Sequence, residues 1–309
     1  MRQLARDRTS GSGELALHAC GILERFVAGR SRSANATVGT AERCGQLARA
    51  VASAQPSMAA VLNVSNRWLC AVEQGAPPAA TARRLARELR QAQKTAAMRA
   101  ARLVADGVTV ATYSASSTVL ATLLGCRRAG RRFRVLCSES RPRREGLQLA
   151  GRLAEAGVPV EMHTDAGLFS ALADADLAPD LVLVGCDAIL PGCFVNKAGT
   201  GALLAAARRS RIPFYIIADS FKFLPKGLAP WFRIRPQSPA EVWRVTRRAP
   251  QNAPRKNITV RNFYFEKIPL RACTAVVTES GLWTPNKISA LLKCAEIATG
   301  LKQPQPFPH

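Results

Sequence analysis

The sequence predicts an α/β protein in which a helical N-terminal domain, residues 1–107, precedes a Rossmann-like domain with a mostly parallel, doubly wound sheet, residues 108–309. Three observations predict this class. Apolar residues recur at helical spacing through the first hundred positions, and after residue 108 short apolar runs alternate with helical stretches. The length of 309 residues and the hydrophobic share of 48% suit two domains with buried cores. An alternating order of strand and helix is typical of parallel sheets.

Four helices are predicted before residue 107. Apolar side chains recur at helical spacing from residue 15 to 26 and from residue 44 to 51, so each set lies on one face of a helix. A third helix is expected over 58–72, after the break at Pro56. A fourth, strongly basic helix is expected over 80–105, with its basic face in solvent, and the Asp-Gly pair that follows is a typical helix stop.

After residue 107 the apolar runs become short. Strands are expected over 108–113, 133–138, 158–163, 181–184, 214–218 and 274–278. Helices are expected near 117–129, 144–156, 167–176, 198–210 and 286–298. Residues 222–260 carry several Pro and Arg residues and little periodicity, so they are predicted to form a long, partly mobile excursion before 258–265 returns to the fold.

The net charge of +23 favours an anionic ligand or an acidic partner. Arginines are spread along the predicted helices and in short clusters, with no interleaved aromatic residues that would stack on bases. No helix-turn-helix, zinc-finger or RNA-recognition signature is present. We therefore expect no sequence-specific nucleic-acid binding, and only weak, salt-sensitive attraction to polyanions.

The nine cysteines form no CxxC pair, and the three histidines show no metal-ligand spacing. We therefore predict no metal site and no cofactor. An odd number of unclustered cysteines is typical of a reducing compartment. The N-terminal residues lack the apolar core of a signal peptide, and no apolar run reaches the length of a membrane span, so a cytoplasmic protein is expected.

The best candidate site follows the strand predicted at 181–184. Asp187 comes where that strand emerges, and Asn196, Lys197 and Gly199 follow within twelve residues. Ligands of open α/β sheets bind at the carboxyl ends of the strands. We expect Lys197 to bind phosphate, Asn196 to bind hydroxyls, and Asp187 to transfer a proton or bind a sugar hydroxyl. The alternative is that Asp187 caps the next element and that Lys197 is a surface charge.

Three further segments reach the same ligand if the strands are parallel. Hydroxyls that include Ser116 open the helix expected at 117, where free N–H groups bind anions; the alternative is a plain N-cap. Arg141 follows the strand at 133–138 and either binds phosphate bidentately or lies at the surface. The small-residue loop of Gly11, Ser12 and Gly13 is a weaker candidate for a phosphate cradle.

Taken together, these segments resemble a superfamily that contains the alpha, beta and delta regulatory subunits of eukaryotic initiation factor 2B, ribose-1,5-bisphosphate isomerase and methylthioribose-1-phosphate isomerase. The resemblance runs from about residue 9 to residue 298. It is carried by SESRPRREG (138–146), VGCDAILPGCFVNKAGT (184–200), PFYIIADSFKF (213–223) and FYFEKIP…VVTESGLWTP (263–285). The segment PSMAAVLNVSN (56–66) resembles the N-terminal helical domain of the family.

The resemblance implies a helical domain followed by a Rossmann-like domain, and dimers that associate further in some members. In the isomerases, an aspartate at the position of Asp187 protonates the ring oxygen as the sugar opens, and a cysteine removes the C2 proton. Asn196, Lys197 and Arg141 match positions that hold substrate hydroxyls and phosphate. The loop 11–13 lies where the isomerases carry an Arg-Gly-Ala phosphate loop, with Ser10 at the arginine position.

Ser114 stands where the isomerases have their cysteine, and a serine hydroxyl needs a neighbouring base. No histidine is placed to serve. Cys186 and Cys193 are substitutes whose geometry the sequence leaves open, and Cys186 is expected on the face opposite to Asp187.

The resemblance therefore implies two functions. The first is a non-catalytic, initiation-factor-2B-like protein that binds a phosphorylated sugar or nucleotide, or partner subunits, as a homodimer or larger oligomer. The alternative is an aldose–ketose isomerase acting on ribose 1,5-bisphosphate or a related pentose 1-phosphate, with Asp187 as the general acid.

Overall fold

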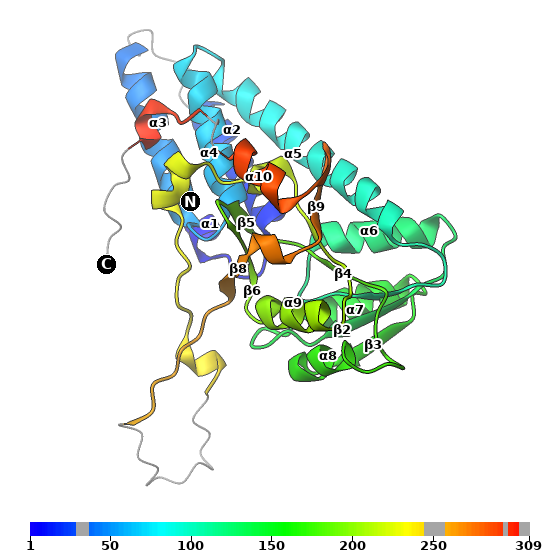
Figure 1. Ribbon diagram of the computed structural model, residues 1–309. Helices are drawn as coiled ribbons and strands as arrows, with labels where there is room; N and C mark the ends of the chain where they lie inside the picture. The colour runs from blue at the N-terminus through cyan, green and yellow to red at the C-terminus, as the bar shows by residue number, and fades with distance from the viewer. Residues whose placement is uncertain (29–36, 244–256, 293–295, 303–309) are drawn as a thin grey trace.

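The structure, a computed structural model, describes residues 1–28, 37–243, 257–292 and 296–302. The N-terminal part is helical: α1 (Arg2–Arg6), α2 (Ser12–Ala28), α3 (Thr37–Ala54), α4 (Ala59–Glu73) and α5 (Pro78–Ala100), followed by a short 3-10 turn, η1 (Ala101–Leu103). Figure 1 shows α5 as the long helix that reaches from this part to the sheet. The helices predicted in this part of the chain are confirmed.

Helix α5 belongs to two cores. Leu85 and Leu89, in its first half, are buried with the N-terminal helices, whereas Ala96 and Ala100 are buried against the sheet. These residues recur at helical spacing on one face, and the opposite face carries the arginines. The small alanines let the end of α5 lie close to α6 (Ser117–Arg128) and to the strands it covers. A single amphipathic helix thus joins the helical part to the sheet.

The main sheet has seven strands in the order β10-β9-β7-β4-β1-β2-β3. Its strands are β1 (Thr109–Ala111), β2 (Arg134–Ser138), β3 (Val160–His163), β4 (Leu181–Val184), β7 (Phe214–Ile217), β9 (Ala275–Thr278) and β10 (Gly281–Trp283). All pair in parallel except β10, which is antiparallel to β9. The predicted mostly parallel sheet and its six strands are confirmed.

Helices connect the strands in the order predicted. They are α6, α7 (Glu145–Glu155), α8 (Asp165–Ala171), α9 (Thr200–Arg209) and α10 (Pro285–Leu291). Two predicted helices are too long: α8 ends at Ala171 rather than 176, and α10 ends at Leu291 rather than 298. Residues 293–295 of the second prediction lie outside the described residues.

A second, antiparallel sheet was not predicted. It consists of β5 (Ala188–Leu190), β6 (Cys193–Lys197) and β8 (Phe265–Pro269), in the order β5-β6-β8. Gly192 forms the hairpin turn with a φ of 80°, which favours glycine. The predicted return of the chain near 258–265 thus ends in a strand of this small sheet, which carries Asn196 and Lys197 on β6.

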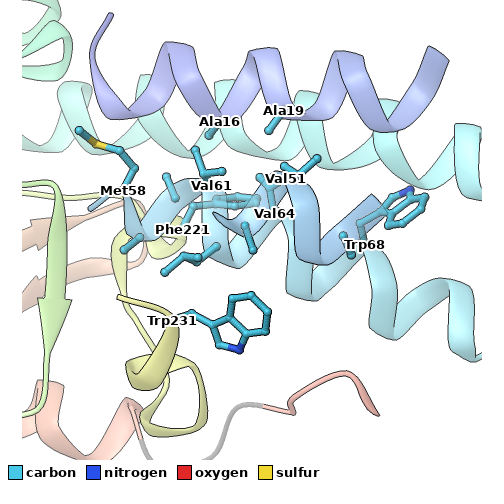
Figure 2. Close-up of a cluster of buried hydrophobic side chains, with 14 of the residues drawn as sticks. Ala16, Ala19, Val51, Met58, Val61, Val64, Trp68, Phe221 and Trp231 are labelled. Atoms are coloured by element: carbon cyan, nitrogen blue, oxygen red, sulfur yellow. The ribbon is translucent and has the colours of Figure 1, made fainter. Parts of the chain in front are cut away.

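The predicted excursion at 222–260 is wrong for its first part. Residues 220–222 and 226–231 form 3-10 turns, η2 (Ser220–Lys222) and η3 (Lys226–Trp231); η2 packs against α4, and η3 adds buried side chains to the same core. Phe221 and Trp231 are each 1% exposed and share a core with Val61 and Val64, as Figure 2 shows. The chain then leaves the body as an arm, joined to its return at the Pro236–Phe263 bridge (Figure 1). The middle of the predicted excursion, 244–256, lies outside the described residues.

Among the described residues, no helix combines the length and apolar character that crossing a bilayer requires.

Candidate functional site

A cavity of about 160 Å³ lies at the carboxyl ends of β1 and β4. From β1 the chain proceeds to β2 and β3 on one side, and from β4 it proceeds to β7 and β9 on the other. The connections therefore diverge between these two central strands, which is where open α/β sheets bind ligands. The start of α2, the start of α7 and the small sheet complete the walls.

The structure brings most of the predicted site residues together in this cavity. Its lining includes Gly11, Ser12, Ser114, Ser116, Asp187, Asn196 and Lys197. Gly13 and Arg141 are not among the lining residues. A Cβ at Gly13 would lie 3.1 Å from Cδ of Gln93, so this glycine faces the side chain of a residue on α5.

Asp187 lies in the turn between β4 and β5. Its backbone N–H donates to the carbonyl of Val195 at 2.8 Å, and its own carbonyl accepts from the N–H of Ala59 at 3.2 Å, so the small sheet and the start of α4 fix it. Burial raises the pKa of the carboxyl group, while Lys222 and a hydrogen bond from Ser12 oppose that rise. A carboxyl group with a raised pKa holds its proton to higher pH and can donate it to a ligand.

Lys197 is 2% exposed, and its charge is balanced by an ion pair inside the protein. Its Nζ donates to Oε1 of Glu145 at 2.6 Å and lies 5.3 Å from the centre of the Tyr264 ring. The alternative of a surface charge is therefore wrong. Because the carboxylate of Glu145 already balances the positive charge of Lys197, Lys197 is a weaker phosphate ligand than the sequence suggested.

Ser114 follows β1 and also donates a hydrogen bond to the carboxylate of Glu145. Its Oγ donates to Oε1 of Glu145 at 3.2 Å, and its backbone N–H donates to Oγ of Ser140 at 2.9 Å. The residue has a φ of 66°, which is uncommon for a side chain other than glycine. Sequence reasoning missed Glu145, the first residue of α7, although it lies within the segment 138–146 that carried the family resemblance.

Asn196 and Ser116 have structural partners inside the protein. The Nδ2 of Asn196 donates to Oγ1 of Thr200 at 3.0 Å. The Oγ of Ser116 accepts from the N–H of Val119 at 3.3 Å, so the N-cap considered for it is present. A Cβ at Gly185 would lie 2.7 Å from Cβ of Ser116, so only glycine lets the end of β4 approach this cap.

Lys222 is a further buried charge that the sequence did not single out. It is 5% exposed, and it lines the cavity beside Cys186 and Asp187. Burial lowers the pKa of the amine, but the nearby Asp219, Cys186 and Asp187 together outweigh this effect, so the pKa is raised. The sequence did contain a signal for this region: Asp219 follows β7 in the same way as Asp187 follows β4.

Two arginines lie at the exposed edge of the cavity. Arg8 precedes α2, and Arg143 comes from the loop before α7, with its guanidinium 5.9 Å from the centre of the Tyr264 ring. Arg141 is exposed and outside the lining, while its backbone N–H donates to Oδ2 of Asp165 at 2.8 Å. The structure therefore puts Arg143 where the sequence placed Arg141.

Neither cysteine near Asp187 offers a reactive thiolate. Cys186 lines the cavity, but burial raises the pKa of its thiol to about 12. Cys193 begins β6 and packs against the helical core, outside the lining. Within the part of the chain that the structure describes, no three His, Cys, Asp or Glu side chains gather as a metal site.

The charged groups of the lining favour an anion. Four cations, Arg8, Arg143, Lys197 and Lys222, outnumber two carboxyl groups, Glu145 and Asp187, and the pKa of Asp187 is raised by burial. Serine hydroxyls and the helix start at Ser12 add hydrogen-bond donors. The arrangement suits a compact ligand that carries both phosphate and hydroxyl groups.

Residues 8–285 match the Initiation factor 2 subunit family. The chain belongs to this family. Over 241 residues it is 31% identical to an eIF-2B subunit 2-like protein of Pyrococcus horikoshii, covering 78% of this chain and 80% of that protein. Over 184 residues it is 33% identical to the ribose 1,5-bisphosphate isomerase of Methanocaldococcus jannaschii, covering 59% of this chain and 56% of the isomerase.

Solved structures have the same fold. The crystal structure of translation initiation factor eIF-2B from Pyrococcus horikoshii OT3 superposes with a TM-score of 0.75 at 26% identity, covering 93% of this chain and 96% of that one. The 5-methylthioribose 1-phosphate isomerase of the same organism superposes with a TM-score of 0.67 at 20% identity, covering 94% of this chain and 86% of the isomerase. The family named from sequence motifs is confirmed, and it contains both translation factors and isomerases.

Proposed function

We propose that this chain binds a phosphorylated sugar in the cavity between β1 and β4. The observation that carries the proposal is the excess of four lining cations over two carboxyl groups, beside hydroxyl and amide side chains. A cavity of about 160 Å³ is smaller than the ~300–1,000 Å³ typical of pockets for larger ligands, which favours a pentose phosphate over a nucleotide.

Within this proposal, Arg143 and Arg8 bind the phosphate. Both lie at the exposed edge of the cavity, whereas the charge of Lys197 is taken by Glu145 at 2.6 Å. An arginine holds a phosphate through two parallel hydrogen bonds. Asn196, Ser114 and the segment 11–12 then face the sugar hydroxyls.

Isothermal titration with ribose 1,5-bisphosphate tests the proposal. Arg143→Ala is expected to weaken binding at least tenfold, about 1.4 kcal/mol, while Arg141→Ala, two residues away and outside the lining, changes it less than threefold. No binding by the unaltered chain, or equal losses in the two variants, would contradict this assignment.

A second candidate function is aldose–ketose isomerisation of that sugar phosphate. It is favoured by Asp187, because burial raises the pKa of its carboxyl group and lets it hold a proton to higher pH than an exposed aspartate does. The isomerase relatives support the reaction class, and the replacement of the family cysteine by Ser114 opposes it. Proton NMR of ribose 1,5-bisphosphate with the chain and with Asp187→Asn decides the point: ketose formation that the variant loses supports an isomerase, and no turnover leaves a binding protein.

We also propose that the chain assembles with copies of itself or with related subunits, as its family membership suggests. Light scattering behind size-exclusion chromatography tests this. A mass of at least twice the 33.2 kDa of one chain is expected, and a mass of one chain at micromolar concentration would contradict self-assembly.

A further inference from the structure

A hydroxyl, a carboxylate and an ammonium group converge on one oxygen in the cavity. Ser114 Oγ donates to Oε1 of Glu145 at 3.2 Å, and Lys197 Nζ donates to the same oxygen at 2.6 Å. The three residues come from the end of β1, the start of α7 and the end of β6, and all three line the cavity with Asp187. Glu145 is therefore placed as the neighbouring base that Ser114 needs and that the sequence did not reveal.

The backbone holds Ser114 in place for this contact. Its φ of 66° costs free energy for a residue with a side chain, and the hydrogen bond from its N–H to Ser140 Oγ, 2.9 Å, fixes it. Such conformations cluster where a side chain must be presented in one direction. Here that direction brings the hydroxyl to Glu145.

Gly146 helps to fix the position of Glu145 at the start of α7. A Cβ at Gly146 would lie 3.0 Å from the carbonyl carbon of Ser138 and would overlap its oxygen, so α7 begins in direct contact with the end of β2. The side chain of Glu145 is 25% exposed, and its Oε2 is buried with no hydrogen-bond partner among the described residues. One oxygen is thus held by two donors while the carboxylate retains unused acceptor capacity.

We propose that Ser114 and Glu145 act together as the proton acceptor of a sugar-phosphate isomerisation, with Ser114 relaying the proton to Glu145. The inference rests on the second candidate function and deepens it by naming the group that replaces a thiolate. A hydroxyl paired with a base is the usual way in which serine becomes reactive.

Asp187 gives its proton to the ring oxygen as the bond from that oxygen to C1 breaks. The C2–H bond then breaks, its electron pair forms the C1=C2 double bond, its proton goes to Ser114 Oγ, and the serine proton moves to Glu145 Oε1. Return of a proton to C1 and loss of the C2 hydroxyl proton to Asp187 give the ketose and restore all three residues.

Lys197 pairs with the carboxylate of Glu145 in the resting protein at 2.6 Å. When Glu145 takes a proton, the ammonium group of Lys197 is left without a counter-charge and becomes available to the phosphate groups of the ligand. The other buried acceptor beside Asp187, the thiol of Cys186, has a pKa of about 12 and remains protonated.

The test is proton NMR of ribose 1,5-bisphosphate in D2O, which follows both ketose formation and exchange of the C2 proton. Glu145→Gln and Ser114→Ala are each expected to slow turnover at least 100-fold, the usual contribution of a general base, while titration shows that binding is retained. Glu145→Asp is expected to keep part of the activity. Glu155→Gln, the same substitution at an exposed site of the same helix, is the matched control and leaves the rate unchanged.

Each outcome decides between the claims. Full activity of Glu145→Gln overturns the proposal, and full activity of Ser114→Ala alone overturns the relay. If the unaltered chain binds the sugar without turnover or exchange, the isomerase function itself fails, and the inference falls with it. If Glu145→Gln does not fold, Ser114→Ala and Glu145→Asp carry the test, because neither removes the carboxylate that pairs with Lys197.

Discussion

We expect that removing either partner of the ion pair between Glu145 and Lys197 lowers the stability of the protein. The size of the loss depends on which of the two residues is removed. The Lys197 side chain is 3% exposed and that of Glu145 is 25% exposed, at an N–O distance of 2.6 Å. Removing one partner of a buried pair costs about 3–5 kcal/mol, because the other charge stays out of water without compensation. The cost therefore depends on which partner remains.

The magnitudes follow from this exposure. Glu145→Gln leaves the ammonium group of Lys197 fully buried, so we expect a loss of about 3 kcal/mol, at the low end because glutamine still accepts a hydrogen bond. Lys197→Met leaves Glu145, whose side chain is 25% exposed against 3% for Lys197, so the loss is expected to be smaller, about 1–2 kcal/mol. The double variant is expected to lose about 1.5–2 kcal/mol less than the sum of the two single variants.

Urea denaturation of the three variants and the unaltered chain at pH 7 measures this cycle. The coupling is expected to persist at 1 M salt, because buried pairs are screened far less than exposed ones. The exposed pair of Arg84 and Glu88 on α5 is the matched control, with a coupling of about 0.3–0.5 kcal/mol. Additive losses for Glu145 and Lys197 would refute the reasoning, since they would show that the two charges do not interact.

Three other predictions concern stability. Gly185→Ala is expected to lose about 1 kcal/mol, because the added Cβ displaces the Ser116 cap of α6; an unchanged urea midpoint would contradict it. Asp187→Asn is expected to stabilise the protein at pH 7 but not below about pH 4: burial raises the folded pKa, so the ionised acid costs stability only above its unfolded pKa, and a constant gain across this pH range would refute it. Trp231→Ala is expected to cost about 3–5 kcal/mol in denaturation, against almost nothing for Trp243→Ala, because Trp231 is 1% exposed and Trp243 48%; similar losses would contradict the packing of η3.

The strands of the parallel sheet were predictable because most of them are short apolar runs that are buried in the fold. The small sheet was not, because the segment 188–197 mixes buried residues with a turn at Gly192 and has neither a long apolar run nor a helical period. Its absence from the prediction matters for the site, since β6 carries Asn196 and Lys197. The sequence indicated those residues only through their place after β4.

The sequence of the buried segment 220–231 contains an apolar pattern that its prolines obscure. Phe221, Leu224, Leu228 and Trp231 recur at spacings of three, four and three, yet Pro225 and Pro230 exclude a regular α-helix. The chain instead forms two 3-10 turns that bury the same residues in one core with side chains of α4. The prolines exclude a regular helix here but leave the apolar spacing intact.

The charges of the site were the least predictable feature. Lys197 and Glu145 lie 52 residues apart, and only the adjacent ends of β6 and α7 bring them together. Arg141 and Arg143 cannot be told apart by sequence, because the loop between β2 and α7 contains two left-handed residues, Ser140 and Arg144, that set its direction. Strand ends predict where a site lies, but loop geometry decides which side chain enters it.

A crystal structure of the chain soaked with ribose 1,5-bisphosphate is the most direct test of the proposed site. We expect density for the sugar in the cavity between β1 and β4, with one phosphate within hydrogen-bond distance of Arg143 and a sugar hydroxyl near Ser114. Density at another place on the molecule, or an empty cavity at a ligand concentration that saturates binding in titration, would contradict it.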